Sequence, residues 1–339
     1  MFQEIAIEVF KISCVVLTLL GIVAYTVLAE RRVAAWMQDR IGPNRVGFQG
    51  LLQPIADFMK LLLKEDILPG YVNKPYYILA PALVIVPSLL TISVIPWGSY
   101  VGDMKCVLAD MDVGLLFIFA VTSLTVYGIV LAGWSSNSKY SFLGGIRSSA
   151  QMISYEVCLG LSVVGLLLQT GTMNLGEIVE YQGANGWLIL TQPIGFFVFM
   201  VSAFAETNRL PFDFPEAEQE LVGGYHTEYS SMKFALFFLG EYANMAISSA
   251  LMATLFFGGW SLPFAPFNAP AESVGVGLAH IGIFMLKLFA FIFLFIWVRW
   301  TLPRFRYDQL MRIGWNFMVP LALVNLLVTA AIITWGATR

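Results

Sequence analysis

The chain has 339 residues with a formal net charge of −3; 58% of them are hydrophobic, only 12% are charged, and the mean hydropathy is +0.76. Soluble proteins contain about 25% charged residues, so this composition excludes a soluble enzyme and a nucleic-acid-binding protein and indicates a polytopic membrane protein. The three cysteines form no CxxC pair and there are only two histidines, so we expect no bound metal, iron–sulfur cluster or haem. Neither a Walker A sequence nor a GxGxxG motif is present, and any electron carrier must come from another chain.

Apolar runs of about 20 residues, the length needed to cross a bilayer, define the predicted architecture. The fold class we expect is an all-α polytopic membrane protein with eight transmembrane helices in a single membrane domain. If both termini are on the outer side, the inner segments hold 15 of the 19 Lys and Arg residues, whereas the outer loops hold Lys105 alone. The predicted spans are approximately residues 6–29, 77–97, 113–133, 147–168, 192–210, 233–257, 277–301 and 315–336.

The first inner segment contains a predicted interfacial helix at about residues 48–64. Its apolar positions follow a helical period with a polar stripe, which is typical of a helix lying flat in the membrane interface. Pro54 is expected to start or kink its main part. A surface anchor would explain this pattern, but Asp57 and Lys60 lie three residues apart on one face and are equally placed to line an opening.

Charged residues stand immediately before this helix, at the inner end of the first span. Glu30 and Arg31 follow the apolar run directly, and Asp39 and Arg40 come eight residues later. Arginines at such a position usually anchor the span to the interface. Beside the polar stripe, these alternating charges would also form a charged mouth through which an amphiphile leaves the lipid.

Ionisable residues also occur within the predicted spans themselves. Glu156 lies nine residues past Arg147, about 13 Å deep, and Glu241 lies eight residues past Lys233, about 12 Å deep. Glu206 enters from the same side in the fifth span. Carboxylates at this depth are costly unless they are neutral or paired, so they are either structural hydrogen-bonding groups or members of a proton path. Other candidates for this path are Tyr155, Tyr242 and Lys287, the last as the cation that sets the pKa values of the acids.

An acidic inner loop at residues 211–232, together with the end of the fifth span, is the most charged stretch. Residues 205–229 contain six of the 22 acidic residues, with Arg209 as the only formal positive charge. A solvated loop between two helices would explain them, but the position of Glu206 inside the apolar run favours a loop that handles protons or gates a ligand. The acidic residues are Glu206, Asp213, Glu216, Glu218, Glu220 and Glu228.

Several long motifs in this sequence resemble one known family. They are Ala29–Arg32, Arg40–Arg45, Gly50–Leu62, Ala205–Asp213 and Glu216–Glu241. The chain is similar over residues 5–336 to the H subunits of the proton-pumping NADH:quinone oxidoreductases, the counterparts of mitochondrial subunit 1 of respiratory complex I. It looks closer to the bacterial form, so we expect the bacterial inner membrane, with the mitochondrial inner membrane as the second choice.

This resemblance implies a subunit that forms most of the wall of a ubiquinone chamber and carries no redox cofactor itself. Ubiquinone is the implied substrate, and the FMN and iron–sulfur clusters belong to partner subunits of the peripheral arm. Glu30, Arg31, Arg40, Asp57 and Lys60 would line the entrance and channel. The acidic loop, with Arg209, would face the chamber, and Tyr155, Glu156 and Glu241 would continue the path toward antiporter-like subunits.

Three alternatives remain at the level of the sequence. A self-sufficient ion transporter would use buried carboxylates, but it predicts inverted repeats that the two halves do not display. The related membrane subunit of an energy-converting hydrogenase docks a similar arm but reduces no quinone, and the charged mouth favours a lipid-soluble substrate. A purely structural anchor leaves the deep acids unexplained.

Overall fold

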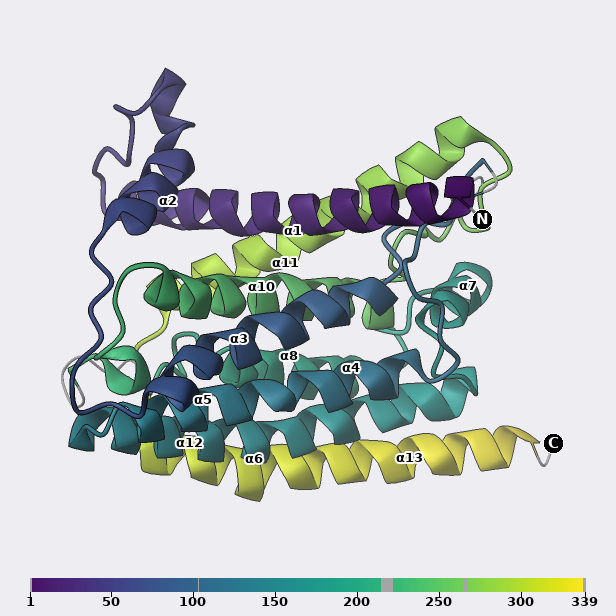
Figure 1. Cartoon of the computed structure of the whole chain (residues 1–339). Coiled ribbons are helices and arrows are strands. Elements are labelled where there is room, and N and C mark those ends of the chain that lie inside the picture. Colours follow the sequence, from purple (N-terminus) through teal and green to yellow (C-terminus); the bar gives the residue numbers. More distant parts are fainter. Residues whose placement is uncertain (1, 103, 215–221, 265–266, 338–339) are drawn as a thin grey trace.

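The computed structural model describes residues 2–102, 104–214, 222–264 and 267–337. Its long helices run side by side as a bundle, and the two ends of the chain lie at the same end of that bundle (Figure 1). Within the described residues, seven helices are long and apolar enough to cross a membrane. The prediction of an all-α polytopic membrane protein is therefore confirmed.

The helices follow the predicted spans with small shifts at their ends. Two of the spans contain a short break, between α4 and α5 at Ser123 and, in the last one, at a π-helical turn over Gly314–Met318. The helices are α1 (Phe2–Met37), α2 (Gln53–Leu63), α3 (Lys74–Thr91), α4 (Gly114–Thr122), α5 (Leu124–Ser135), α6 (Lys139–Thr170), α7 (Leu175–Asn185), α8 (Pro193–Glu206), α10 (Ser231–Phe256), α11 (Val274–Thr301), α12 (Tyr307–Ile313) and α13 (Val319–Ala337).

The predicted fifth span, residues 192–210, is shorter in the structure than the length of a full span. Its helix, α8, has 14 residues and ends at Glu206. At 1.5 Å per residue α8 is about 21 Å long, less than the roughly 30 Å of a bilayer core. The number of eight spans and the side of the membrane on which the termini lie both stay predictions.

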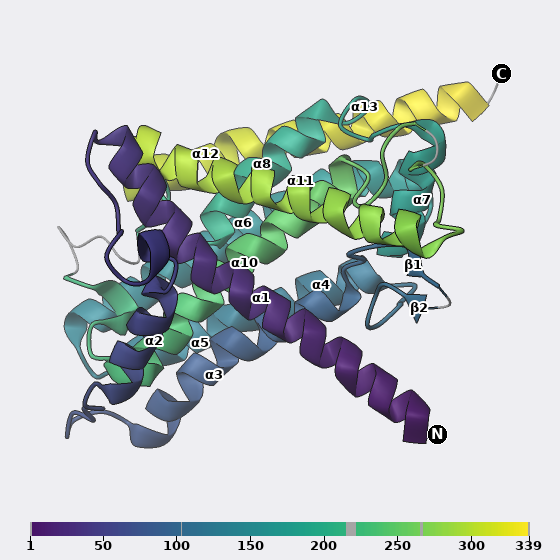
Figure 2. The same cartoon turned by 90° about the horizontal axis from the view of Figure 1, so that it is seen from above.

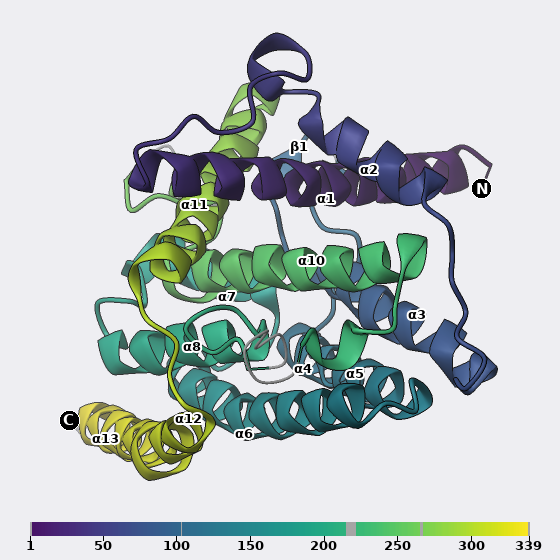
Figure 3. The same ribbon diagram turned by 90° about the vertical axis from the view of Figure 1, so that its left-hand side faces the viewer.

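The bundle is arranged in layers when its left-hand side in Figure 1 faces the viewer. Helices α1 and α11 cover one side, α10 lies behind them, α3, α5, α6 and α8 follow, and α13 lies against α6 on the far side (Figure 3). Seen from above, α1 crosses α10 diagonally, and its N-terminal half leaves the other helices (Figure 2). Helix α10 is consequently the most buried of the long apolar helices described, and every residue from Met245 to Phe256 is buried.

Small residues allow the central helices to pack closely. A Cβ atom at Gly128 of α5 would lie 2.7 Å from Val84 of α3, and one at Gly240 of α10 would also lie 2.7 Å from Val84. Because lipid gives no hydrophobic drive for helices to associate, such close approach is a common source of stability in membrane bundles. Alanine at either position would force α3 away from its neighbours.

The predicted interfacial helix is present but divided. A 3-10 turn, Phe48–Gly50, precedes α2, and Pro54 lies in the first turn of α2 as expected. Gly50 has a φ of +77°, and a Cβ there would lie 2.2 Å from the carbonyl oxygen of Pro43. Glycine at this position therefore permits the tight turn that separates the two pieces.

Two further elements lie in the predicted outer loops. Strands β1 (Tyr100–Val101) and β2 (Met104–Lys105) pair as a short antiparallel ribbon. Helix α7 begins at Leu175 and is capped by Asn174, whose side chain accepts hydrogen bonds from the backbone N–H groups of Gly176 and Glu177. Asparagine is a favoured N-cap residue, and this signal is readable in the sequence.

Candidate functional site

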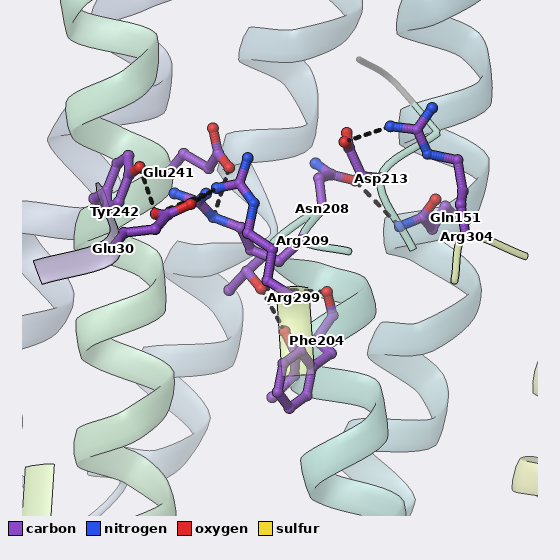
Figure 4. A network of polar contacts seen from close by, with 12 residues as sticks. Glu30, Gln151, Phe204, Asn208, Arg209, Asp213, Glu241, Tyr242, Arg299 and Arg304 are labelled. Atoms are coloured by element: carbon purple, nitrogen blue, oxygen red, sulfur yellow. Dashed lines mark hydrogen bonds and ion pairs between the residues drawn. The ribbon is translucent and has the colours of Figure 1, made fainter. Parts of the chain in front are cut away.

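A buried cluster of charges joins α1, α10, α11 and the loop after α8. Arg209 lies at its centre, with its Nε 2.8 Å from a carboxylate oxygen of Glu241 and one terminal nitrogen 3.6 Å from Glu30. The other oxygen of Glu30 pairs with Arg299, and the hydroxyl of Tyr242 donates to Glu30 at 2.7 Å. We call these five residues the central charge cluster (Figure 4).

The central charge cluster contains two carboxylates and two guanidinium groups, so its formal charges cancel. The side chains of Arg209 and Glu30 are 4% and 8% exposed, and the guanidinium of Arg209 lies 4.0 Å from the centre of the Tyr242 ring. Burying one unpaired charge costs several kcal/mol, so each member depends on its partners. The arrangement explains how carboxylates are tolerated at this depth in an apolar bundle.

Arg209 is positioned by hydrogen bonds to the short loop that follows α8. The side-chain amide of Gln151, on α6, donates to the carbonyl oxygens of Ala205 and Phe212, each at 2.8 Å. The backbone N–H of Phe212 donates to the carbonyl of Arg209 at 2.8 Å. Gln151 is fully buried, so these bonds fix the loop on both sides of Arg209.

A second ion pair holds the beginning of the acidic loop. Asp213 accepts from Arg304 at 2.9 Å, and the side chain of Asp213 is 8% exposed (Figure 4). The backbone N–H of Phe305 donates to the carbonyl of Pro211, next to this pair. The segment between α11 and α12 thereby attaches the loop to the same end of the bundle.

The predicted entrance residues divide into two groups. Arg31, on α1, lies 2.8 Å from Asp57 of α2, and Lys60 lies 3.9 Å from the same carboxylate. All three side chains are at least 22% exposed, which places them at the surface, where we expected a mouth. Glu30 instead points into the central charge cluster, and Arg40 is exposed and donates to Gln38.

Glu206 and Glu156 lie outside the central charge cluster, near enough for their carboxylates to repel each other. Glu206 ends α8 and lines a cavity of about 10 Å³, the size of one water molecule, with Thr122, Asn244 and Ser248. Glu206 lies three residues before Arg209, so the two acids and the cluster are linked through one turn of chain.

Among the remaining acids of the loop, Glu228 is the one that the structure describes, and it has a different partner. Glu228 accepts from the Tyr71 hydroxyl at 2.6 Å, and this hydrogen bond raises the pKa of Tyr71 above its ordinary value. Glu228 thus attaches the loop to the segment before α3. Glu216, Glu218 and Glu220 lie outside the described residues.

Comparison with known proteins assigns this chain to a protein family. A family model described as NADH dehydrogenase matches residues 10–330. The H 1 subunit of the NADH-quinone oxidoreductase of Cytophaga hutchinsonii is 51% identical, over 97% of this chain and 95% of its own. The H 2 subunit of the Koribacter versatilis enzyme is 53% identical over 96% of both chains, and subunit 8 of the Rhodothermus marinus enzyme is 53% identical over 90% of both.

This chain belongs to the family of NADH-quinone oxidoreductase H subunits. The predicted resemblance is confirmed, and the chain is a membrane-embedded subunit of that enzyme complex. In this H subunit, some of the predicted charged residues lie together in the central charge cluster, whereas others lie elsewhere.

Three site residues of this H subunit are not among those that the sequence predicts. Arg299 and Arg304 follow the pattern of basic residues on the inner side, but they also pair with Glu30 and Asp213. Gln151 is the third, and a glutamine in the middle of a long apolar helix is a signal of interhelical hydrogen bonding. A polar residue inside a predicted span is therefore the sequence signal by which such a site residue can be recognised.

Two predicted members of the proton path have other contacts. Tyr155 is fully buried, and its hydroxyl donates to the carbonyl of Leu310 at 3.0 Å, which joins α6 to α12. Lys287 donates to the carbonyls of Phe257, Gly259 and Ser261 at 2.6–2.8 Å, at the far end of α10 from Glu241. Lys287 thus contacts backbone carbonyls rather than Glu241, as is common for a cation near the C-terminus of a helix, and its place in the proton path stays a prediction.

Replacing Lys287 by methionine is expected to lower the Tm of the isolated enzyme complex while changing quinone-linked turnover by less than twofold. The substitution leaves three carbonyls without their donor, and each buried unsatisfied group costs about 1–3 kcal/mol. Differential scanning calorimetry and turnover per flavin measure the two effects. The matched control is Lys139→Met at an exposed helix start. An unchanged Tm with lost turnover would instead return Lys287 to the proton path.

Proposed function

We propose that this chain forms the membrane wall of a chamber that receives ubiquinone from the bilayer, and that it couples reduction of the quinone to proton translocation. In this proposal the chain supplies no redox group. Electrons arrive from iron–sulfur clusters and FMN in partner subunits of the peripheral arm, and antiporter-like subunits continue the membrane arm. The setting is the inner membrane of a bacterium, with both termini on the outer side.

The observation that carries this proposal is the continuity of charged groups between the surface and the bundle interior. Glu30 and Arg31 are consecutive on α1; one faces the central charge cluster and the other pairs with Asp57 at the interfacial helix α2. A lipid-soluble substrate that enters beside α2 would therefore meet fixed charges within one helical turn. Asp57, Lys60 and Arg31 are the proposed entrance, and Arg40 is a peripheral member of it.

Coupling in this proposal is electrostatic. Reduction of a quinone consumes protons and changes the charge of the chamber, and buried ion pairs respond strongly because the surrounding dielectric is low. Arg209 would shift its pairing between Glu30 and Glu241, and Asp213 and the loop acids Glu216, Glu218, Glu220 and Glu228 would change protonation with it. The change would pass through Glu206 to Glu156 and, with Tyr155, toward the partner subunits. Neighbouring acids such as Glu206 and Glu156 would share their titration and respond together.

The entrance is tested by replacing Arg31 with alanine. We expect the KM for long-tailed quinones to rise about three- to tenfold, because the exposed carboxylate of Asp57 loses the partner that holds α2 against α1. Turnover with a short-tailed, water-soluble quinone is expected to stay unchanged. Steady-state kinetics of the assembled enzyme with both quinones measure the difference, and Arg31→Lys is the conservative control. Identical kinetics and inhibitor sensitivity in the alanine variant would exclude a role at the entrance.

A further inference from the structure

A second hollow lies in the same helices, nearer the end of the bundle where the chain's termini lie. It is an apolar cavity of about 140 Å³ between α1, α10, α11 and the segment after α3, with walls that include Leu19, Ala250 and Phe284. Engineered apolar cavities of about 150 Å³ stay dry and accept a molecule the size of benzene. This cavity therefore has room for a segment of hydrocarbon chain.

The mouth of the cavity opens where lipid is the solvent. The first half of α1 leaves the bundle, as Figure 2 shows, and Cys14 and Thr18 are exposed along it while Leu19 is 1% exposed. The hydroxyl of Thr18 donates to the carbonyl of Cys14 at 2.7 Å, so it offers no free donor to the mouth. A hydrocarbon chain that enters beside Thr18 therefore meets no free hydroxyl donor there.

One polar side chain of the lining and one cation next to it in the chain are relevant to the occupant: Trp97 lines the cavity, and Lys11 precedes the lining residue Cys14 on α1. The indole Nε1 of Trp97 is buried with no hydrogen-bond partner among the described residues. Lys11 lies one helical turn before Cys14; its side chain is 18% exposed and pairs with Glu8 at 2.7 Å. A buried indole N–H normally has a hydrogen-bond acceptor. We therefore expect a molecule bound in the cavity to provide the acceptor for Trp97.

We propose that the cavity binds one membrane phospholipid, with an acyl chain between α1 and α11, an ester carbonyl at the indole N–H of Trp97, and the phosphate at Lys11. Each part of the ligand meets the chemistry that suits it: hydrocarbon meets the apolar walls, the ester oxygen meets the orphan donor, and the anion meets the ammonium. The site is separate from the central charge cluster, because Ile22 at its inner end precedes Glu30 by eight residues, about 12 Å along α1.

The bound lipid would support the N-terminal half of α1. The N-terminal half of α1 has few neighbours, and a chain held beneath it fills space that would otherwise leave Leu19 and Phe284 without contacts on one side. The same helix carries Glu30 and Arg31, so the lipid would also fix the angle at which α1 presents them.

Photolabelling of the assembled enzyme complex tests this site. The probe is phosphatidylglycerol with a diazirine on one acyl chain, added to delipidated enzyme, with labelled peptides identified by mass spectrometry. We expect label on the peptide that contains Cys14 and Leu19, reduced at least tenfold by Ala250→Phe, which fills the cavity. The matched control, Ala290→Phe on the exposed face of α11, is expected to label as the unmodified enzyme does.

Two further variants test the polar contacts without filling the cavity. Trp97→Phe removes one neutral hydrogen bond and is expected to weaken labelling about three- to tenfold at sub-saturating lipid. Lys11→Gln is expected to weaken labelling by the phospholipid but not by a diacylglycerol with the same diazirine chain, because only the first carries phosphate. These variants keep the proposal testable if Ala250→Phe fails to assemble.

Three outcomes would overturn the proposal. Equal labelling of Ala250→Phe and the unmodified enzyme would mean annular lipid only. Labelling that excess ubiquinone abolishes, and excess phospholipid does not, would assign the cavity to the quinone tail. Full labelling of both Trp97→Phe and Lys11→Gln would show that the apolar cavity has no selectivity for phospholipid.

Discussion

Replacement of Arg209 by methionine is expected to lower the stability of the membrane arm by about 3–5 kcal/mol and to abolish quinone-linked NADH oxidation. Arg209 is the shared partner of Glu30 and Glu241, and its removal leaves a buried negative charge without compensation. We expect a lower yield of assembled complex and a lower Tm, measured by native electrophoresis and calorimetry.

The carboxylate of Glu241, one of the two partners of Arg209, provides a matched test of this prediction. In the double variant Arg209→Met with Glu241→Gln, the uncompensated carboxylate is gone, and assembly is expected to recover partly. Glu30 keeps Arg299 and Tyr242 as partners in that variant. Arg306→Met is the surface control, because its side chain is 81% exposed. Wild-type assembly and Tm in the single methionine variant would show that the central charge cluster contributes nothing to the fold.

Glu241→Gln is expected to reduce quinone-linked NADH oxidation at least tenfold in a complex that still assembles. The amide is nearly isosteric, and its oxygen still accepts a hydrogen bond from Arg209. It cannot take up or release a proton, which the proposed coupling requires. NADH oxidation by a water-soluble acceptor, which draws electrons from the peripheral arm, is expected to stay unchanged.

The control for this experiment is Glu272→Gln, an exposed acid in the loop before α11. It changes the formal charge by the same amount and is expected to leave both activities unchanged. Full quinone-linked activity in an assembled Glu241→Gln enzyme would remove Glu241 from the proposed path.

Hydropathy predicts the long helices well, because a run such as residues 277–301 has few alternatives in an apolar chain; the helix found there is Val274–Thr301. It fails where charge interrupts a helix. The predicted first span ends at residue 29 because Glu30 and Arg31 follow, yet α1 continues to Met37. The backbone remains helical because Glu30 is neutralised inside the bundle rather than exposed at its end.

The candidate site is predictable only in part for a related reason. Sequence can show that Glu241 is too deep for an unpaired charge and that Arg209 is the one cation of the acidic stretch, but it does not show that they meet each other. The partners of Glu30 lie 179 and 269 positions away in the chain, at Arg209 and Arg299. Local patterns carry no information on such pairs, whereas the contact of Arg31 with Asp57 follows from an interfacial helix adjacent to the first span.

The lysine at the far end of α10 has a consequence for how two helices move. Lys287 lies in the middle of α11, and its side chain donates to three carbonyls in the turn that follows α10. Fifteen positions separate Glu241 from Phe256 at that end of α10, about 22 Å of helix. A displacement of α11 along its axis would therefore be transmitted to α10, the helix that carries Glu241.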